Sequence, residues 1–180
     1  MNTEELIHGC RRNDRRVQKA LFLKYKDMIY LASLKYCRNA AEAEDNLQDT
    51  FITVFERIRS YNGTGSFEGW MKRIAINMAI DKFKYAVKFN SEVNDGPDED
   101  LSIPADTSIS LDEVLKLIRE LPDQYRLVFN LYELDDYSHK EIAAMLDISE
   151  STSKSNLHRA KSILKQKIQA TRTEAYKSNT

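Results

Sequence analysis

Hydrophobic residues recur at helical spacing through most of this chain. One such stripe comprises Leu21, Phe22, Tyr25, Met28, Ile29, Ala32 and Tyr36. A second comprises Leu47, Phe51, Val54, Phe55 and Ile58. Spacings of three and four residues are typical of helices that bury one face. Alternating runs are few and the 180 residues include only 5 Gly and 3 Pro, so the pattern predicts an all-α fold.

Capping and turn residues predict where the helices of the first half begin. Thr3 is expected to cap a first helix, and Asp14 a longer second one. A third helix is expected from about Ala41. The turn-forming run YNGTGS, residues 61–66, then separates it from a fourth helix over residues 67–85. The first half therefore predicts a bundle of four helices.

Between two helical blocks, residues 88–110 lose the helical period and hold one base, Lys88, against six acids. Such polar, acidic segments do not bury enough apolar surface to fold. We therefore expect two small helical domains joined by a flexible acidic linker. The first domain spans residues 1–87, the second residues 111–170, and residues 171–180 form a polar tail.

The segment 137–167 predicts two helices joined by a tight turn. Ser138, followed three residues later by Glu141, matches a capping box that opens the first helix. Asp147-Ile148-Ser149 supplies the turn, and Ser149 is expected to cap the second helix. Inward positions of the second helix are Leu157, Ala160, either Ile163 or Leu164, and Ile168. The second domain is thus predicted to end in a helix-turn-helix.

The outer face of that second helix is expected to be polar and basic. From Glu150 to Arg172 the chain holds six bases against one acid. A basic second helix in this motif is typical of DNA binding in the major groove. An ordinary helical hairpin with a solvated basic face remains the alternative. The candidate DNA-contacting residues are Lys154, Ser155, Asn156, His158 and Arg159.

Other classes of site find little support in the sequence. Cys10 and Cys37 are isolated thiols, which fits a reducing cytoplasm, and His8 lacks further ligands nearby to complete a metal site with Cys10. There is no Gly-rich phosphate loop or nucleophile elbow. No uncharged apolar run reaches membrane-spanning length, and the N-terminus is too polar for a signal peptide. We expect no catalytic residues, cofactor, metal or membrane insertion.

Four segments, taken together and in order, resemble the sigma-70 family of bacterial RNA polymerase sigma factors, and more narrowly its extracytoplasmic-function group. They are AEDNLQDTF (43–51), FEGWMKRIAINMAID (67–81), LPDQYRLVFNL (121–131) and YSHKEIAAMLDIS with TSKSNLHRAK (137–161). The resemblance covers Leu6 to Lys167. It implies a non-enzymatic subunit that binds core polymerase and directs transcription from promoters through their −10 and −35 elements. An anti-sigma factor is an expected further partner.

The resemblance gives a role to the acidic face of the third helix, which composition alone would leave as a solvated surface. In the family this helix docks on the coiled coil of the β′ subunit. Asp45, Gln48 and Asp49 occupy the docking positions, where carboxylates and amides suit bidentate Arg partners. Asn46 departs from the usual aliphatic, which could weaken packing or add a polar contact.

The turn and the helix after it match the part of the family that opens the promoter and reads its −10 element. Aromatics interleaved with bases suit stacking on single-stranded DNA, although Phe67 and Trp70, taken singly, are favoured as core residues because an aromatic at helical spacing usually is one. Asn77 occupies the position that contacts a flipped base in relatives, and an amide can donate and accept along a base edge. The candidate −10 residues are Asn62, Trp70, Arg73 and Asn77.

The helix-turn-helix matches the domain that recognises the −35 element and binds the β flap. Ser153 replaces a usual aliphatic and Asn156 a frequent Arg. Because Asn favours adenine where Arg favours guanine, the promoter preference is expected to differ from that of well-known members.

Two other functions stay open on the sequence. A stand-alone helix-turn-helix transcriptional regulator would bind duplex DNA without polymerase, but leaves the first domain without a purpose. A helical adaptor that never touches DNA would not need the basic face.

Overall fold

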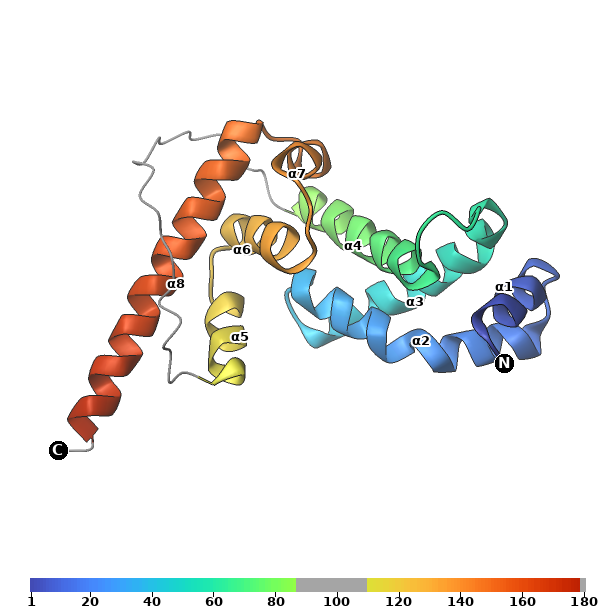
Figure 1. Ribbon diagram of the computed structural model, residues 1–180, viewed down its shortest axis with the longest axis horizontal. Coiled ribbons are helices and arrows are strands. Elements are labelled where there is room, and N and C mark those ends of the chain that lie inside the picture. The colour runs from blue at the N-terminus through green and yellow to red at the C-terminus, as the bar shows by residue number, and fades with distance from the viewer. Residues whose placement is uncertain (87–109, 179–180) are drawn as a thin grey trace. The chain divides into compact units, whose positions relative to one another are not determined.

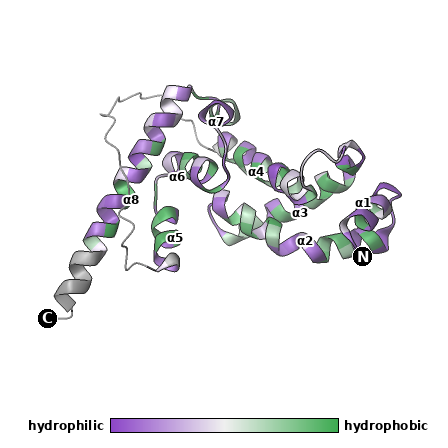
Figure 2. Cartoon of the chain, viewed as in Figure 1, coloured by the Kyte–Doolittle hydropathy of each residue, from purple (hydrophilic) through white to green (hydrophobic). Residues whose placement is uncertain are grey.

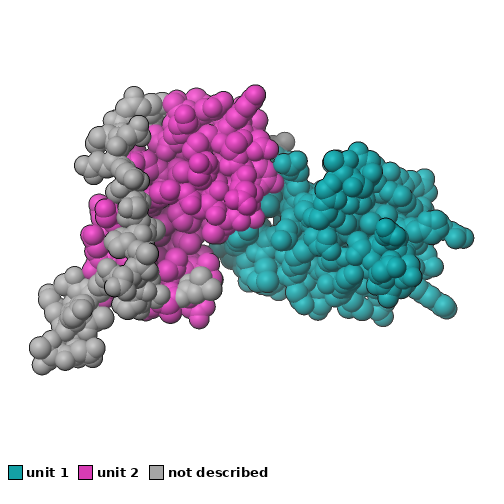
Figure 3. Space-filling view, viewed as in Figure 1, with its two compact units in different colours: residues 1–88 teal, residues 89–180 magenta. Residues whose placement is uncertain are grey.

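The computed structural model describes residues 1–86 and 110–178. The expected linker at 88–110 lies outside the described residues except for Ser110. The chain divides into two compact units, residues 1–88 and 89–180, which we describe separately (Figures 1 and 3). The described residues contain helices and no strand, which confirms the predicted all-α fold.

The described residues of unit 1 form four α-helices and one short 3₁₀ turn. They are α1 (Thr3–Arg11), α2 (Arg15–Tyr36), α3 (Ala40–Arg57), η1 (Ile58–Ser60) and α4 (Phe67–Ala86). In unit 2, residues 110–178 form four α-helices and one π-helical turn. They are α5 (Leu111–Arg119), α6 (Asp123–Phe129), η2 (Asn130–Leu134), α7 (His139–Leu146) and α8 (Glu150–Ser178).

The helix starts largely follow the capping pattern, with one correction. Asp14 caps α2 as predicted, since its side chain accepts a hydrogen bond from the backbone of Arg16 at 2.9 Å. The prediction that Thr3 caps α1 is wrong. Asn2 is the cap, because its side chain accepts from the Glu5 amide at 2.8 Å and the Glu5 carboxylate accepts from the Asn2 amide at 2.9 Å. The Thr3 hydroxyl instead lies 3.1 Å from the hydroxyl of Tyr25.

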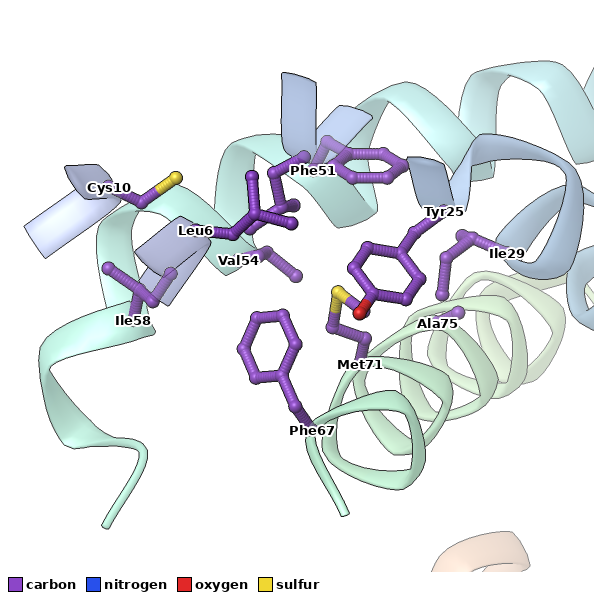
Figure 4. Packing of buried hydrophobic residues seen from close by; sticks show 11 residues of the cluster. Leu6, Cys10, Tyr25, Ile29, Phe51, Val54, Ile58, Phe67, Met71 and Ala75 are labelled. Carbon is purple, nitrogen blue, oxygen red and sulfur yellow. The ribbon is translucent and has the colours of Figure 1, made fainter. Parts of the chain in front are cut away.

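The core of unit 1 forms where α2, α3 and α4 pack together (Figure 4). Both predicted apolar stripes supply it, because Leu21, Tyr25 and Ile29 of α2 are buried against Phe51 and Val54 of α3. The other helices add Leu6, Cys10, Ile58, Phe67, Met71 and Ala75. Hydrophobic and hydrophilic residues alternate along these helices (Figure 2), as helices with one buried face require.

A buried amide also lies between these three helices. Asn46 on α3 has no exposed surface, and its Nδ2 donates to Ser33 Oγ on α2 and to the Ala75 carbonyl on α4, each at 3.0 Å. The Ser33 hydroxyl donates in turn to the Ile29 carbonyl at 2.9 Å. The departure at Asn46 therefore adds a polar contact, and it links three helices through one side chain.

The core of unit 2 lies where α8 packs against α6 and α7. Leu157, Ala160, Leu164 and Ile168 of α8 are buried, so Leu164 and not Ile163 is the inward residue of that pair. Helix α8 continues to Ser178. The described part of the polar tail, residues 171–178, is therefore helical.

We expect the volume of Asn46 to matter more to the stability of unit 1 than its polarity. Asn46→Ala leaves a void and removes both hydrogen bonds, which should lower the free energy of unfolding by about 1–3 kcal/mol. Asn46→Leu fills the space and removes the buried Oδ1 that has no partner among the described residues. It should therefore stay within about 1 kcal/mol of the parent.

Urea unfolding of the full chain measures this, followed by the fluorescence of Trp70, the single tryptophan of the chain, which lies in unit 1. Equal destabilisation by both substitutions would show that the hydrogen bonds, and not the volume, carry the stability.

Candidate nucleic-acid and partner interfaces

The acidic face of α3 points away from the core of unit 1. Asp45 and Gln48 are exposed, and Asp49 is partly exposed. Asn46 is buried between α2 and α4, whereas the neighbouring Asp45, about 100° further round the axis of α3, is exposed. The structure therefore brings the three predicted docking residues together on one surface.

The two carboxylates of this face differ in their surroundings. Asp49 forms an ion pair with Lys82 of α4. Asp45 lines a hollow of about 170 Å³ together with Arg38, Lys82 and Phe83. A partner must compete with Lys82 for Asp49 but not for Asp45.

Sequence reasoning missed an apolar residue on the same face. Ile52 follows Gln48 by four residues and Asp49 by three, so it lies on the same side of α3, and it is 57% exposed. The sequence could have identified Ile52 as a surface residue, because it is an aliphatic residue outside the predicted buried stripe of this helix. The surface thus combines carboxylates and an amide with one exposed aliphatic side chain.

The turn before α4 is closed by its own hydrogen bonds. The Tyr61 hydroxyl donates to the Gly65 carbonyl at 2.8 Å, and the Thr64 amide donates to the Asn62 side chain at 3.0 Å. Gly63 has a φ of 82°, a conformation that residues with a Cβ adopt at a cost. We call residues 61–66 the specificity loop.

An aromatic cluster joins this loop to α4. The Tyr61 ring lies 5.2 Å from Phe67 and 5.5 Å from Trp70, and Phe67 stacks on Trp70 at 5.6 Å. Phe67 is buried, so its alternative interpretation as a core residue is confirmed, whereas Trp70 is only partly buried. The cluster fixes the ring of Tyr61 and leaves part of Trp70 accessible.

The predicted −10 residues lie on this loop and along one side of α4. Asn62 follows Tyr61 in the loop. Arg73 follows Trp70 by three residues, and Asn77 follows Arg73 by four. Asn62, Arg73 and Asn77 are exposed. Chemically, this side offers an aromatic ring, a guanidinium and two amides, a set that suits unpaired bases and phosphates.

The helix-turn-helix of unit 2 follows its predicted geometry. Ser138 forms the capping box with Glu141, through hydrogen bonds of 3.3 Å and 2.9 Å. Asp147 ends α7 with a φ of 59°, and the Ser149 hydroxyl accepts from the Thr152 amide at 3.0 Å. The predicted turn and both caps are confirmed.

The outer face of α8 differs from the prediction at one residue. Lys154 is exposed, and Ser155, His158 and Arg159 are partly exposed. Asn156 is only 5% exposed, so its prediction as an outward residue is wrong. It follows Thr152 by four residues and therefore shares the buried side of α8 with that residue. Arg159 also donates to the Tyr125 hydroxyl of α6 at 3.0 Å, which ties its side chain to unit 2.

Ser153 forms a polar link between the two helices of the motif. It is fully buried, and its hydroxyl lies 2.9 Å from Nδ1 of His139 on α7. The His139 ring also stacks on Tyr132 at 4.4 Å. Burial lowers the pKa of His139, and Lys154 and Lys161 lower it further, while Glu150 opposes them. A serine in place of an aliphatic therefore pairs with a histidine whose surroundings favour its neutral form.

No other class of site emerges among the described residues. They contain no group of three or more His, Cys, Asp or Glu side chains that could hold a metal ion. Burial raises the pKa of the Cys10 thiol to about 11, which makes it unreactive at neutral pH. None of the described helices combines the length and hydropathy that a membrane span requires.

Two family models match the chain, one to each unit. The model for sigma-70 region 2 matches residues 21–88, and the model for sigma-70, region 4 matches residues 111–164.

Curated relatives match across both units. The ECF RNA polymerase sigma factor SigW of Bacillus subtilis is 32% identical over 158 residues, covering 80% of this chain and 84% of the relative. The ECF RNA polymerase sigma-E factor of Escherichia coli K12 is 24% identical over 183 residues, covering 94% of this chain and 95% of the relative.

Solved structures share the fold. The sigma factor RpoE of Bartonella quintana, in complex with the anti-sigma factor NepR, matches with a TM-score of 0.52 and 18% identity, covering 84% of this chain and 96% of that one. CnrH, in complex with the cytosolic domain of CnrY, matches with a TM-score of 0.50 and 18% identity, covering 92% and 96%.

We predict that acid destabilises unit 2 through His139. Because its folded-state pKa lies below its ordinary value of 6.5, the unfolded chain takes up the proton first as the pH falls. Stability should be complete above that value and decline below it, towards the lowered pKa. His139→Gln should remove this part of the decline.

The measurement is urea unfolding of the full chain by circular dichroism at about pH 7.5 and about pH 5.5, either side of the usual histidine pKa. His158→Gln on α8 is the matched control and should keep the decline. An equal decline in the parent and in His139→Gln would assign the acid sensitivity to other groups.

Proposed function

The chain belongs to the ECF RNA polymerase sigma factors of the sigma-70 family, and from this premise we propose how its two units share the work of promoter recognition. It is a transcription initiation factor that directs promoter-specific transcription, and not an enzyme. Unit 1 binds core polymerase and reads and melts the −10 element. Unit 2 reads the −35 element and contacts the β flap.

The observation that supports this assignment best is the presence of two different polar surfaces on the three packed helices of unit 1. The acidic face of α3 carries Asp45, Gln48 and Asp49, and the aromatic and amide side of α4 carries Trp70 and Asn77. The Asn46 amide of α3 bonds the Ala75 carbonyl of α4 between these surfaces. A protein that must hold polymerase and open DNA at once needs two such surfaces in a fixed relation.

We assign the α3 surface to the coiled coil of the β′ subunit. Asp45 and Gln48 are available to bidentate Arg partners, and Ile52 supplies apolar area beside them. Asp49 contributes once a partner displaces Lys82, with which it is paired in the free chain.

We assign Asn62, Trp70, Arg73 and Asn77 to the −10 element. Extruding a base from duplex DNA costs a few kcal/mol, which stacking and base-edge hydrogen bonds must offset. Trp70 offers a partly exposed ring for stacking, Arg73 a charge for phosphate, and the exposed Asn77 amide an edge that both donates and accepts.

We assign four side chains of α8 to recognition of the −35 element: Lys154, Ser155, His158 and Arg159. The helix-turn-helix presents them on the side of α8 away from the buried core. Asn156 is left out because its side chain is buried. The Arg159 guanidinium, already bonded to Tyr125, is held in a defined position for a base or a phosphate.

The remaining partner is an anti-sigma factor. Both structural relatives described above were solved as complexes, one of them with a protein named as an anti-sigma factor. We propose that such a protein also regulates this chain, and that the chain works in the cytoplasm, where polymerase and promoters are found.

Charge reversal at Asp45 should weaken binding to core polymerase. We expect Asp45→Lys to lower the affinity at least about tenfold, because it places a cation against the partner's Arg groups. Asp49→Asn should have a smaller effect, since the Asp49 charge is already balanced by Lys82. Fluorescence titration of labelled protein with core polymerase measures both affinities.

Asp27→Lys on α2 is the control for charge reversal, since the Asp27 side chain is 87% exposed and lies on another helix. Circular dichroism should show the same helix content in every variant. Parent-like affinity of Asp45→Lys would remove α3 from the polymerase interface.

Asn77→Ala should reduce discrimination at one base position of the −10 element. A good base-edge contact is worth about 1–3 kcal/mol of discrimination. The measurement is transcription by core polymerase plus the protein on a promoter library randomised at the −10 and −35 positions, with sequencing of the transcripts. Asn77→Gln, which keeps the amide, is the comparison. An equal loss at all positions would make Asn77 a structural residue.

A further inference from the structure

Helix α1 contacts the segment that leads from α3 into the specificity loop. The Arg11 guanidinium donates to the Tyr61 carbonyl through Nη2, and Nε lies 3.4 Å from the Ile58 carbonyl. In the opposite direction, the Arg59 guanidinium donates to the Arg11 carbonyl, with distances of 3.2 Å from Nη2 and 3.4 Å from Nε. We call this reciprocal set of contacts the Arg11–Arg59 clasp.

The clasp binds backbone groups that helix ends leave without intrahelical partners. The Ile58 carbonyl lies where α3 passes into η1, and the Arg11 carbonyl lies at the end of α1. Carbonyls at helix C-termini need other donors and favour nearby cations. Each guanidinium bonds the backbone of the other segment. A movement of either segment therefore breaks the hydrogen bonds of both guanidinium groups.

Tyr61 is the residue on which the clasp and the aromatic cluster converge. Its carbonyl is held by Arg11 from α1, while its ring packs on Phe67 and Trp70 of α4. Its hydroxyl reaches Gly65 and so closes the loop. The position of Asn62, the next residue, therefore depends on the clasp and on the aromatic cluster.

The α1 side of the loop is otherwise open. A hollow of about 730 Å³ lies there, lined by residues of α1 that include His8 and Arg11 and by Tyr61, Asn62 and Gly63 of the loop. Asn62 and Gly63 are exposed, and Gly63 would meet nothing within 4 Å if it carried a Cβ. Packing therefore does little to hold the loop on this side. The hydrogen bond from Arg11 to the Tyr61 carbonyl connects the loop to α1 there.

We propose that Arg11 is a positioning residue for promoter recognition, which holds the specificity loop in the conformation that reads the −10 element. Arg11 acts through the backbone of Tyr61 and need not touch DNA. The −10 specificity of the protein thus depends on α1, a helix to which we assign no DNA-contacting residue. This inference rests on the proposed assignment of the loop to the −10 element.

The first arm of the test measures the loop without DNA or polymerase. Trp70 is the single tryptophan and contacts Tyr61, so its fluorescence reports on the loop. In the full chain, Arg11→Ala should increase quenching of Trp70 by acrylamide. Arg11→Lys, which keeps one donor and the charge, should fall between Arg11→Ala and the parent. Arg12→Ala, at the exposed neighbouring residue, is the matched control and should behave as the parent.

The second arm measures promoter choice on the randomised library with core polymerase. Arg11→Ala should lose about tenfold in discrimination at the −10 positions, the scale expected when charged hydrogen bonds are removed. Its preferences at the −35 positions and its affinity for core polymerase should equal those of the parent. Arg11→Lys should recover part of the −10 discrimination, which a general loss of stability would not produce.

The two arms separate this inference from the proposed function. Unchanged quenching in Arg11→Ala overturns the positioning role whatever the promoter data show. Increased quenching with parent-like −10 discrimination also overturns it, because the loop would then move without consequence for recognition. If the parent itself selects no −10 sequence from the library, the proposed function fails, and the quenching arm still decides whether Arg11 holds the loop.

Discussion

The packing of α3 against α2 and α4 around the buried Asn46 side chain is the constraint on which the geometry of unit 1 depends. One buried Nδ2 bonds the Ser33 hydroxyl of α2 and the Ala75 carbonyl of α4, so three helices share a single polar contact inside an apolar core. Apolar packing tolerates small shifts in register, whereas a buried hydrogen bond has one good geometry. Asp45 precedes Asn46, and Asn77 lies two residues beyond Ala75, so this contact fixes where the polymerase-facing and DNA-facing groups lie.

Unit 2 uses polar contacts in a similar way, at the edges of its core. Ser153 and His139 join the two helices of the helix-turn-helix, and Arg159 and Lys161 of α8 bond Tyr125 and Glu133. The Lys161 ammonium is therefore paired within unit 2, and Arg159 is held in a defined position by its bond to Tyr125. Fewer cations of α8 are thus unpaired than the basic composition of the segment implies.

Much of this could be predicted from the sequence, because helical periodicity and capping are local. The stripes from Leu21 to Ile58, the Asp14 cap and the turn at Asp147 all follow from residues a few positions apart. One failure was local, since the α1 capping box pairs Asn2 with Glu5, but the others depend on partners distant in sequence. Asn156 is a polar residue on a basic helix, and only the packing of α8 shows that it is buried. Nothing near Arg11 in sequence indicates that its guanidinium binds the carbonyl of Tyr61, fifty residues later.

The central claim is that this chain acts as the specificity subunit of polymerase and not as a DNA-binding protein in its own right. The most direct measurement is transcription of fragmented bacterial genomic DNA by purified core polymerase, with and without the protein, followed by mapping of transcript 5′ ends. The account predicts that the protein creates a new set of start sites, all preceded by the same pair of sequence elements at constant spacing. Start sites unchanged by the protein, together with tight binding of the free protein to duplex DNA, would contradict it.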